Sequence, residues 1–462
     1  MDLSENLRRL INSPAFKFIL VCALILSLTV PLLFAFLLVA ERANFARDAR
    51  LAVGQMWGRE QTIRGPYIVA PTRRVREFQT KDGVQRETVR EFGVFLPEEL
   101  IISGDVRSEV RHRGIFEVPV YRSTLSFQGR FVEPDTRAFH QSKVEINWRE
   151  AVVVVTLDDV RGLKSSARFL INDGHEPQMF RAGIGVGGDH RAPGIHVPIA
   201  PEQAEKGFRF TFDLNLNGSS RLNFIPAGGD TVVKVSSDWP HPSFSGAFLP
   251  DQQTITGKGF SAQWSVPRLA RGQGQAFRIP KVNHIMTSSA FGVDFIQPVH
   301  FYRLAERALK YALGFIGIVF LAVFVMEIQS KKRVHWIQYL FVGLALVVFY
   351  LVLIGTAEHI GFELGYLAAA VATSTLVGTY FGIVVKSRLR GACLGALVSV
   401  VYGLLYLLLR IEDYAMLIGS LAAFGLLATV MFATRNVDWS TGSVDMTGLD
   451  QDVQSPERSK PL

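Results

Sequence analysis

The run FILVCALILSLTVPLLFAFLLVA, residues 18–40, decides the class of this protein. It carries no charge, and about 20 apolar residues at roughly 1.5 Å each are enough to cross the hydrocarbon core of a bilayer. A cleaved secretory signal has an apolar region of only about 7 to 15 residues and needs small residues before the cut. Here the run is longer, and Leu38 stands at the third position before a cut after Ala40. We therefore expect an uncleaved membrane-spanning helix.

The composition of the whole chain also indicates a membrane protein. Of 462 residues, 48% are hydrophobic and only 19% are charged, whereas soluble chains average about 25% charged. The apolar excess is concentrated in a few runs, which excludes a purely soluble enzyme, and ordinary glycine and proline usage excludes a collagen-like or disordered chain. Residues 306–433 contain five further apolar runs, which predict helices at about 308–326, 336–357, 364–385, 393–409 and 414–433.

The loops between these helices alternate in charge. Two loops are basic and contain Lys331, Lys332, Arg333, Lys386, Arg388 and Arg390. The other two contain Glu358, His359, Glu363, Arg410, Glu412 and Asp413. Short loops rich in Lys and Arg stay in the cytoplasm. With six helices in all, we expect residues 1–17 and the polar tail 434–462 to be cytoplasmic, and residues 41–305 to lie in the periplasm of a bacterium.

Helical composition continues beyond the membrane at both edges of the exported region. Residues 41–60 contain no proline and are expected to prolong the first helix as a short stalk. Residues 301–311 have a similar composition on the way back into the second helix. Both connections to the exported region are therefore expected to be helical.

The rest of the exported region follows a β pattern. Asp82-Gly83 separates two extended runs, which is a strong hairpin signal. Residues 208–217 alternate between apolar and polar, as in a half-buried strand, and residues 151–157 predict a strand that is buried on both faces. Shorter β-rich runs occur at 115–132, 143–148, 231–236 and 259–266. The pattern predicts a sandwich-like, β-rich domain in one or two packed units.

Motifs for catalysis, metals and cofactors are few. Both cysteines, Cys22 and Cys393, lie in apolar runs, so the polar region has neither a disulfide framework nor a cysteine-based zinc site. The glycine-rich run 183–188 lacks the Lys-Ser/Thr and the helix of a phosphate loop. The run 213–218 resembles half a calcium loop, but Phe224 stands where the bidentate glutamate belongs. The same residues are explained as the wet face of a strand that ends in a turn at Asn217-Gly218. We expect no metal or cofactor.

The charged residues and histidines add no recognised site. The basic residues of 41–305 are scattered, without the dense block of a nucleic-acid binder. The histidines show no metal-ligand spacing, and the nearest approaches to a catalytic pair are Asp189-His190 and Asp238 with His241. No GxSxG elbow and no SxxK with a later KTG is present. We therefore expect a protein without enzymatic activity, and no nucleic-acid partner.

The loop around Trp239 is the best candidate for a contact surface. Prolines stiffen this loop, while aromatic side chains give contact area at a low entropy cost. The candidate contact residues are Asp238, Trp239, His241 and Phe244. Two alternatives stay open: a rigid turn packed on the β core, and an envelope enzyme that acts on cell-wall or lipid material through Asp238 and His241.

The predicted spans contain no ionisable residue far from their ends. Ion-coupled transporters normally carry buried ionisable groups, so a small-molecule transporter is the weaker alternative. The hydroxyl residues Thr373, Ser374, Thr375 and Thr379 are candidates to line a path through the membrane, but the expectation is that they bond across helices. Gly378-xxx-Gly382 and Gly391-xxx-Gly395 fit the close-packing pattern, the second of them beginning in a loop.

Several stretches resemble one family of bacterial membrane proteins. They are ERANFARDA (41–49), GPYIVAP (65–71), FLPEEL (95–100), SDWPHPSFSGAFLP (237–250), GFSAQW (259–264), QYLFVGLALVVFYLVLIGTAEHIGF (338–362) and MFATRNVDW (431–439). These stretches are similar to the CreD family, also called cell envelope integrity protein CreD. The resemblance runs from the first helix to Trp439 and leaves the tail from Ser440 uncovered.

The resemblance implies an inner-membrane protein of the envelope-stress response, usually under a two-component system. In some members of the family it also implies altered sensitivity to colicins or β-lactams. It supplies no catalytic residues and no ligand. The partners expected are therefore the lipid bilayer and either a cell-envelope component or another inner-membrane protein, and the sequence does not set the oligomeric state.

Overall fold

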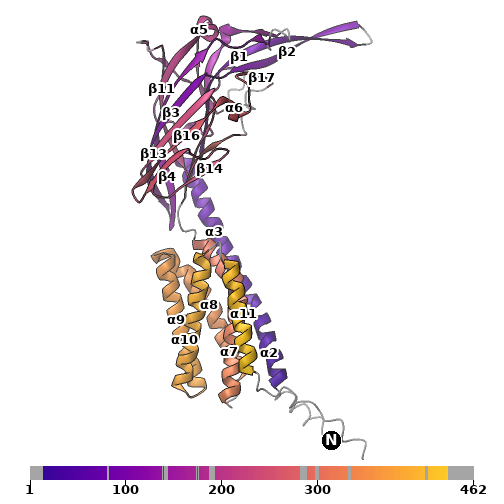
Figure 1. Ribbon diagram of the computed structural model, residues 1–462, viewed down its shortest axis with the longest axis vertical. Helices are drawn as coiled ribbons and strands as arrows, with labels where there is room; N and C mark the ends of the chain where they lie inside the picture. Colours follow the sequence, from indigo (N-terminus) through magenta and orange to yellow (C-terminus); the bar gives the residue numbers. More distant parts are fainter. Residues whose placement is uncertain are drawn as a thin grey trace, which may run out of the picture. The chain divides into compact units, whose positions relative to one another are not determined.

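The computed structural model describes residues 14–80, 83–137, 139, 144–172, 174, 176–186, 193–280, 289–296, 301–330, 334–411 and 415–434. The chain forms two compact units (Figure 1). One unit combines Met1–Asn44 with Val299–Leu462, and the other is Phe45–Pro298. The first is helical and the second is mostly β, as the apolar runs and the alternating runs of the sequence predict.

Six apolar helical segments make up the membrane unit among the described residues. They are α2 (Pro14–Ser27) continuing into α3 (Thr29–Trp57), α7 (Phe301–Ser330), α8 (Trp336–Ile360), α9 (Phe362–Val384), α10 (Arg388–Arg410) and α11 (Ala415–Thr434). Five of these segments meet a length and hydropathy criterion for crossing a membrane. The sixth, α11, is a 20-residue apolar helix at the place predicted for the last span. The expected six-span architecture is confirmed.

The helices of this unit are apolar on their buried sides and on their outer sides. On α8, Tyr339 and Leu346 are buried, whereas Phe341 and Val348 are exposed. A helix that is apolar all round suits a lipid environment, where outward-facing side chains meet hydrocarbon. Inside, the Phe349 ring stacks on the Tyr402 ring with centroids 4.0 Å apart, and the Tyr366 hydroxyl donates to the Tyr402 carbonyl at 2.6 Å.

The helix α10 begins five residues before the predicted start at 393. Ser387 caps it, since its side chain accepts a hydrogen bond from the Arg390 N–H. Arg388 and Arg390 therefore belong to the first turn of the helix rather than to the loop. The second glycine pair, Gly391 and Gly395, lies inside α10, so the prediction that it begins in a loop is wrong.

The β unit is a sandwich of two sheets. Sheet A follows the order β14 (Pro242–Gly246), β18 (Phe291–Phe295), β12 (Arg221–Ile225), β1 (Gln61–Thr80), β6 (Val152–Thr156), β10 (Gly194–Pro198) and β9 (Arg181–Ala182). On sheet A, β2 (Gly83–Phe95) and β5 (Val144–Ile146) also pair with β1, and β17 (Ala276–Ile279) pairs with β2.

Sheet B follows the order β15 (Gln252–Thr256), β16 (Gly259–Val266), β13 (Asp230–Ser237), β3 (Glu99–Arg113), β4 (Phe116–Val132), β11 (Gly207–Ser219), β7 (Arg168–Ile171) and β8 (Gln178–Met179). Among the described residues, four short helices connect the strands: η1 (Trp148–Glu150), η2 (Val160–Gly162), α5 (Pro201–Lys206) and α6 (Arg268–Arg271). The predicted sandwich-like β-rich domain is confirmed.

The main hydrophobic core lies between the two sheets. The strand predicted at 208–217 is part of β11, and its apolar residues from Phe208 to Leu216 point into this core. Because successive side chains of a strand point to opposite faces, the alternating polar residues Arg209, Thr211, Asp213 and Asn215 face outward. The Phe127 and Phe212 rings stack in the core with centroids 4.6 Å apart. The alternation in the sequence predicted this strand and its buried face correctly.

The strand predicted at 151–157 is β6, and it is buried on both faces. Val153 and Val155 join the main core, whereas Val152 and Val154 join a second apolar cluster with Tyr67 and Val69 on the other side of sheet A. Phe45–Pro298 therefore form one compact unit with a main core and a smaller second one. This settles the choice between one and two packed units in favour of one.

The β1–β2 hairpin is paired through its whole described length, and its far part projects from the sandwich (Figure 1). The last described pair joins Thr80 to Gly83. The predicted hairpin is therefore present, and the residue Asp82 of its turn signal lies outside the described residues. A second predicted turn, at Asn217-Gly218, is wrong because β11 continues through both residues to Ser219. The chain turns at Ser220, which has a φ of 61°.

Candidate functional site

The candidate contact loop has two buried aromatic residues. Trp239 is only 9% exposed, and its indole N–H donates to the carbonyls of His241 and Ile296, both at 3.1 Å. Phe244 is half-buried on β14, with its ring edge-on to those of Phe260 and Trp264. Both aromatic side chains thus pack toward the sandwich core, which is the arrangement of the rigid-turn alternative.

The two polar residues of this loop lie at the surface. Asp238 is exposed, and its carboxylate accepts hydrogen bonds from the backbone N–H and the hydroxyl of Ser108, both at 2.7 Å. His241 is also exposed. Asp238 and His241 are therefore the members of this loop that are accessible at the surface, while Trp239 and Phe244 pack beneath them. A contact role for the four residues stays a prediction.

The other sequence candidates are dispersed. In the glycine-rich run, the Gly183 carbonyl lies 2.8 Å from Nδ1 of His196, and a Cβ on Gly185 would come within 2.4 Å of the same ring. Asp189 and His190 lie outside the described residues. In the described part of the chain, no group of three or more His, Cys, Asp or Glu side chains is placed to hold a metal ion.

The outer face of sheet B carries an extended polar surface. Two rows of outward-facing side chains cross six neighbouring strands. The first row is Gln252, Gln263, Lys234, Ser103, Ser126 and Asp213. The second row is Thr254, Ser261, Ser236, Asp105, Thr124 and Asn215. We call the surface made by these twelve side chains the polar trough.

Two hollows deepen the polar trough and meet at Thr124. The first has a volume of about 550 Å³ and extends from β15 to β4. The second has a volume of about 500 Å³ and is lined by Thr124, Asn215, Trp57, Arg122 and Lys164, among others. The Thr124 hydroxyl donates to the Asn215 side-chain carbonyl at 3.0 Å, and the Asn215 amide donates to the Ser165 hydroxyl at 3.0 Å.

Cationic side chains surround Trp57 at one end of the polar trough. The Arg111 and Arg122 guanidiniums lie 4.5 and 5.1 Å from the centre of the Trp57 ring, and the Lys164 ammonium lies 5.9 Å from it. Positive groups at these distances are attracted to the face of an indole ring. Glu109 pairs with both arginines, at 2.7 and 2.9 Å. Among the described residues, Lys164 makes no ion pair, so its charge is available at this end of the polar trough.

A buried polar network closes the sandwich where α3 leads into β1. The Gln61 side chain, which has no exposed surface, donates to the Asp159 carbonyl at 3.0 Å and accepts from the Asp159 N–H at 3.3 Å. Two side-chain hydrogen bonds from Arg161, helped by backbone N–H groups of Arg161 and Arg59, hold the pKa of Asp159 below its usual range. The network fixes the chain at the start of β1.

A buried carboxylate joins three helices of the membrane unit. Glu327 of α7 is only 6% exposed and forms an ion pair with Lys17 of α2. It also accepts hydrogen bonds from the Tyr339 hydroxyl of α8 at 2.8 Å and from the Val334 N–H at 2.7 Å. The sequence placed Glu327 at a helix end but gave no sign of its burial or of its partners. No local pattern could have revealed a pair of residues 310 positions apart.

A second charged contact holds the first helix farther along its length. The Arg42 guanidinium of α3 lies 4.0 Å from the Glu358 carboxylate of α8. The Tyr302 hydroxyl of α7 donates to the same carboxylate at 3.0 Å. Together with Lys17 and Glu327, these residues fasten the first helical segment to α7 and α8 at two points, 25 residues apart on the chain. We call the two contacts the helix clamps.

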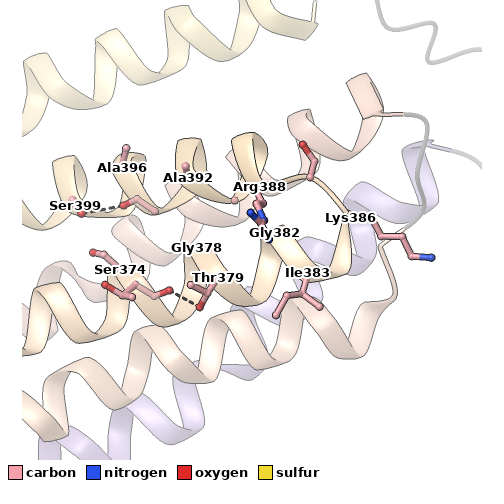
Figure 2. Close-up of a pocket in the computed structure, with 14 residues that line it drawn as sticks. Ser374, Gly378, Thr379, Gly382, Ile383, Lys386, Arg388, Ala392, Ala396 and Ser399 are labelled. Atoms are coloured by element: carbon pink, nitrogen blue, oxygen red, sulfur yellow. Dashed lines mark hydrogen bonds between the residues drawn. The ribbon is translucent and has the colours of Figure 1, made fainter.

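The two glycine pairs bring α9 and α10 into backbone contact. A Cβ on Gly391 would lie 2.6 Å from the Gly378 carbonyl and 2.7 Å from the Gly382 Cα. Beside this contact is a groove of about 760 Å³, and in Figure 2 the Lys386 side chain points away from it. The groove hydroxyls of Thr379 and Ser399 donate to their own helices at 2.7 and 3.0 Å. The packing role predicted for the glycines agrees with this geometry.

Comparisons with known proteins cover nearly the whole chain. A family model described as "Inner membrane protein CreD" matches residues 13–440. The Escherichia coli (strain K12) protein "Inner membrane protein CreD" is 29% identical over 450 residues, which are 97% of this chain and 99% of that protein. The resemblance seen in the sequence is therefore confirmed.

Two of the matching solved structures are distant likenesses. A crystal structure of a mutant M1 zinc metallopeptidase from Deinococcus radiodurans has a TM-score of 0.21 and 11% identity, and the match covers 43% of this chain and 42% of that one. The same enzyme bound to a Tyr-Ser-Ala substrate has a TM-score of 0.22 and 9% identity, covering 67% and 87%. Likenesses of this size carry no weight for fold or function. The family match does, since it spans most of the chain, and this protein belongs to the CreD family of inner membrane proteins.

Proposed function

We propose that this protein is a non-enzymatic envelope-integrity protein of the bacterial inner membrane, whose periplasmic β-sandwich binds or braces a component of the cell envelope. Membership of the CreD family supports the inner membrane as its location. The alternating charge of the loops supports export of the sandwich and cytoplasmic termini. The family resemblance adds regulation by a two-component system of the envelope-stress response.

The helix clamps are the observation that carries this proposal. The sandwich is inserted between α3 and α7, so both of its connections run into helices that the clamps fasten together. Removing one partner of a buried ion pair costs about 3–5 kcal/mol, because the remaining charge is left uncompensated. A domain inserted between helices that are held in this way is suited to bear a load or hold a bound component.

Complementation of cells that lack this protein tests the bracing role. The cells receive either the wild-type protein or variants of the helix clamps. We expect wild-type protein to restore tolerance to a β-lactam, and a Lys17→Met, Arg42→Met double variant to restore much less of it at equal protein level. The physical reason is that the buried Glu327 carboxylate and the half-buried Glu358 carboxylate lose their cationic partners. The measurement is survival at graded antibiotic concentrations, with membrane protein quantified by immunoblot.

The matched control exchanges the charges rather than removing them. A Lys17→Glu, Glu327→Lys variant keeps one clamp with reversed polarity and is expected to protect better than Lys17→Glu alone. Equal protection by the wild type and the Lys17→Met, Arg42→Met variant, at equal protein level, would contradict the bracing role.

The Asp238–Phe244 loop is retained as a proposed contact surface, now centred on Asp238 and His241. Crosslinking from position 241 in intact cells, compared with position 257 on another exposed turn, tests this assignment. The enzymatic alternative has no comparable support, because Ser108 engages the Asp238 carboxylate through two hydrogen bonds. The transporter alternative has none either, because the buried Glu327 lies near the end of α7 and is paired.

A further inference from the structure

We propose that the polar trough binds a linear cell-wall glycan strand that carries carboxylates, with its acidic groups at the Trp57 end. This inference rests on the proposed export of the sandwich and names the envelope component that it meets. The trough crosses six strands, and five intervals of about 4.8 Å give it a length of roughly 24 Å. That length suits several sugar units of an extended chain rather than a small metabolite.

The side chains of the polar trough have the chemistry that sugar hydroxyls require. Nine of the twelve are uncharged Ser, Thr, Asn or Gln residues. Hydroxyl and amide groups both donate and accept hydrogen bonds, as sugar hydroxyls and acetamido groups do. The face has no apolar anchor within these two rows, which disfavours a peptide that is held by hydrophobic side chains.

The hollows provide a path for a chain rather than isolated sites. Each has a volume within the usual range of ligand pockets, about 300–1,000 Å³, and both are lined by Thr124. Lys234, which lines the first hollow, makes no ion pair among the described residues. The two hollows share Thr124, so a bound strand can run through both of them from β15 to Trp57.

Charge decides in favour of an acidic glycan. Five cationic side chains lie on or beside the polar trough: Arg107, Arg111, Arg122, Lys164 and Lys234. Three acidic side chains accompany them: Asp105, Glu109 and Asp213. The excess is positive and concentrated around Trp57. Arginine binds carboxylates through two parallel hydrogen bonds and lysine binds them as a point charge.

Binding to the purified full-length chain in detergent tests the inference. The probe is peptidoglycan glycan strands freed of their peptides, which carry a carboxylate on alternate sugars, and the reference is the neutral hexamer of N-acetylglucosamine. We expect tighter binding of the acidic strands, by tenfold or more. Equal binding of the two glycans, or binding of neither, would overturn the assignment, as would a preference for phosphatidylglycerol vesicles over the strands.

Matched variants locate the site. Thr124→Trp fills the point where the two hollows meet and is expected to weaken strand binding at least tenfold, whereas Gln128→Trp, outward-facing on the same strand but outside the hollows, leaves it unchanged. Lys164→Gln should weaken binding of the acidic strands several-fold and leave the neutral hexamer unaffected. Unchanged binding by Thr124→Trp would overturn the placement of the site.

The outcome is separable from that of the proposed function. Absence of glycan binding, with β-lactam tolerance still dependent on the helix clamps, would remove this inference alone. Conversely, glycan binding by the purified chain together with labelling that places the sandwich in the cytoplasm would remove the proposed function.

Discussion

Single buried polar residues fix the start of the sandwich. Gln61, Asp159 and Asn217 are all nearly inaccessible to solvent. The Gln61 side-chain amide donates to the backbone carbonyls of Asp159 and Asn217, and the Asp159 carboxylate accepts from the Arg161 guanidinium. A buried polar group without a partner costs about 1–3 kcal/mol, so each member depends on the others. This interdependence makes the network a sensitive point of the β unit.

The Asp159 carboxylate provides a test at this scale. Hydrogen bonds from Arg161 lower the pKa of this carboxylate in the folded state below its ordinary value of about 3.9. The carboxylate therefore stabilises the fold at neutral pH, and this contribution is lost as the pH falls through the lowered pKa. We expect Asp159→Asn to reduce the free energy of unfolding by about 1.5–3 kcal/mol at pH 7, the worth of hydrogen bonds to a charged group. Denaturant unfolding followed by tryptophan fluorescence measures it.

The comparison variant is Asp213→Asn, on the exposed face of β11. Surface substitutions of this kind usually change stability by no more than about 0.5 kcal/mol. The difference between wild type and Asp159→Asn should shrink below the ordinary aspartate pKa of about 3.9, because the carboxylate of the unfolded chain then takes up its proton before that of the folded chain does. A constant difference between pH 7 and pH 3 would show that the charge of Asp159 does not stabilise the fold.

Residue-scale features were the least predictable from the sequence. The loop residues Trp239 and His241 stood out by composition, but composition could not show that the indole turns inward and the imidazole outward. The twelve residues of the polar trough were individually unremarkable, because each is an ordinary polar residue on the wet face of a strand. Their alignment depends on pairings between strands that are far apart in the sequence.

At the scale of elements, the glycine pairs set the distance between α9 and α10. Small residues let transmembrane helices approach until their backbones touch. Gly378, Gly382, Gly391 and Gly395 supply this contact from both sides. A side chain at any of these positions has to displace the backbone of the neighbouring helix.

We expect Gly391→Leu to destabilise the membrane unit by about 1–3 kcal/mol, the usual cost of overpacking. The reason is that its Cβ alone would lie 2.6 Å from the Gly378 carbonyl. Gly403→Leu, in the same helix but with no atom within 4 Å of an added Cβ, is the control and should be tolerated. Thermal stability in detergent, followed by size-exclusion chromatography, separates them. Equal losses in the two variants would mean that the glycine contact does not hold the helices together.

Elements themselves were largely predictable. Apolar length gave the spans, a continuous apolar run gave β6, and period-two alternation gave β11 with its buried face. The order of the strands was beyond local patterns, because β1 pairs in parallel with β12, and β3 with β13. The predicted turn at Asn217-Gly218 was wrong because it, too, ignored a contact between strands. A Cβ on Gly218 would come within 2.2 Å of the Tyr121 hydroxyl of the neighbouring strand, so this glycine allows close packing and does not form a turn.

At the scale of the whole molecule, the functional proposals depend on the side of the membrane where each segment lies. Cysteine labelling tests this in a chain whose two native cysteines are replaced by alanine. We expect an impermeant maleimide, added to cells with a permeabilised outer membrane, to label Gly257→Cys in the β15–β16 turn and not Arg388→Cys at the start of α10. The reason is that basic loops stay in the cytoplasm.

Labelling after complete membrane lysis is the control, since both cysteines should then react. The reverse pattern in intact cells would place the sandwich inside and end the periplasmic assignment. At this scale the sequence predicted the division into a helical and a β-rich region and the number of spans, because both follow from apolar length. The helix clamps were not predictable, because they join residues that only the folded chain brings together.

The separation of Lys17 and Glu327 along the chain has a consequence for biosynthesis. These residues are 310 positions apart, and at a synthesis rate of about 5–20 residues per second the second follows the first by about 15 to 60 s. During that interval the first helix is in the bilayer without its acidic partner, while the entire sandwich is still emerging from the ribosome. Completion of α7 therefore marks the moment when the nascent protein can close upon itself, and chains that stop earlier keep an unmatched lysine by which membrane quality control can recognise them.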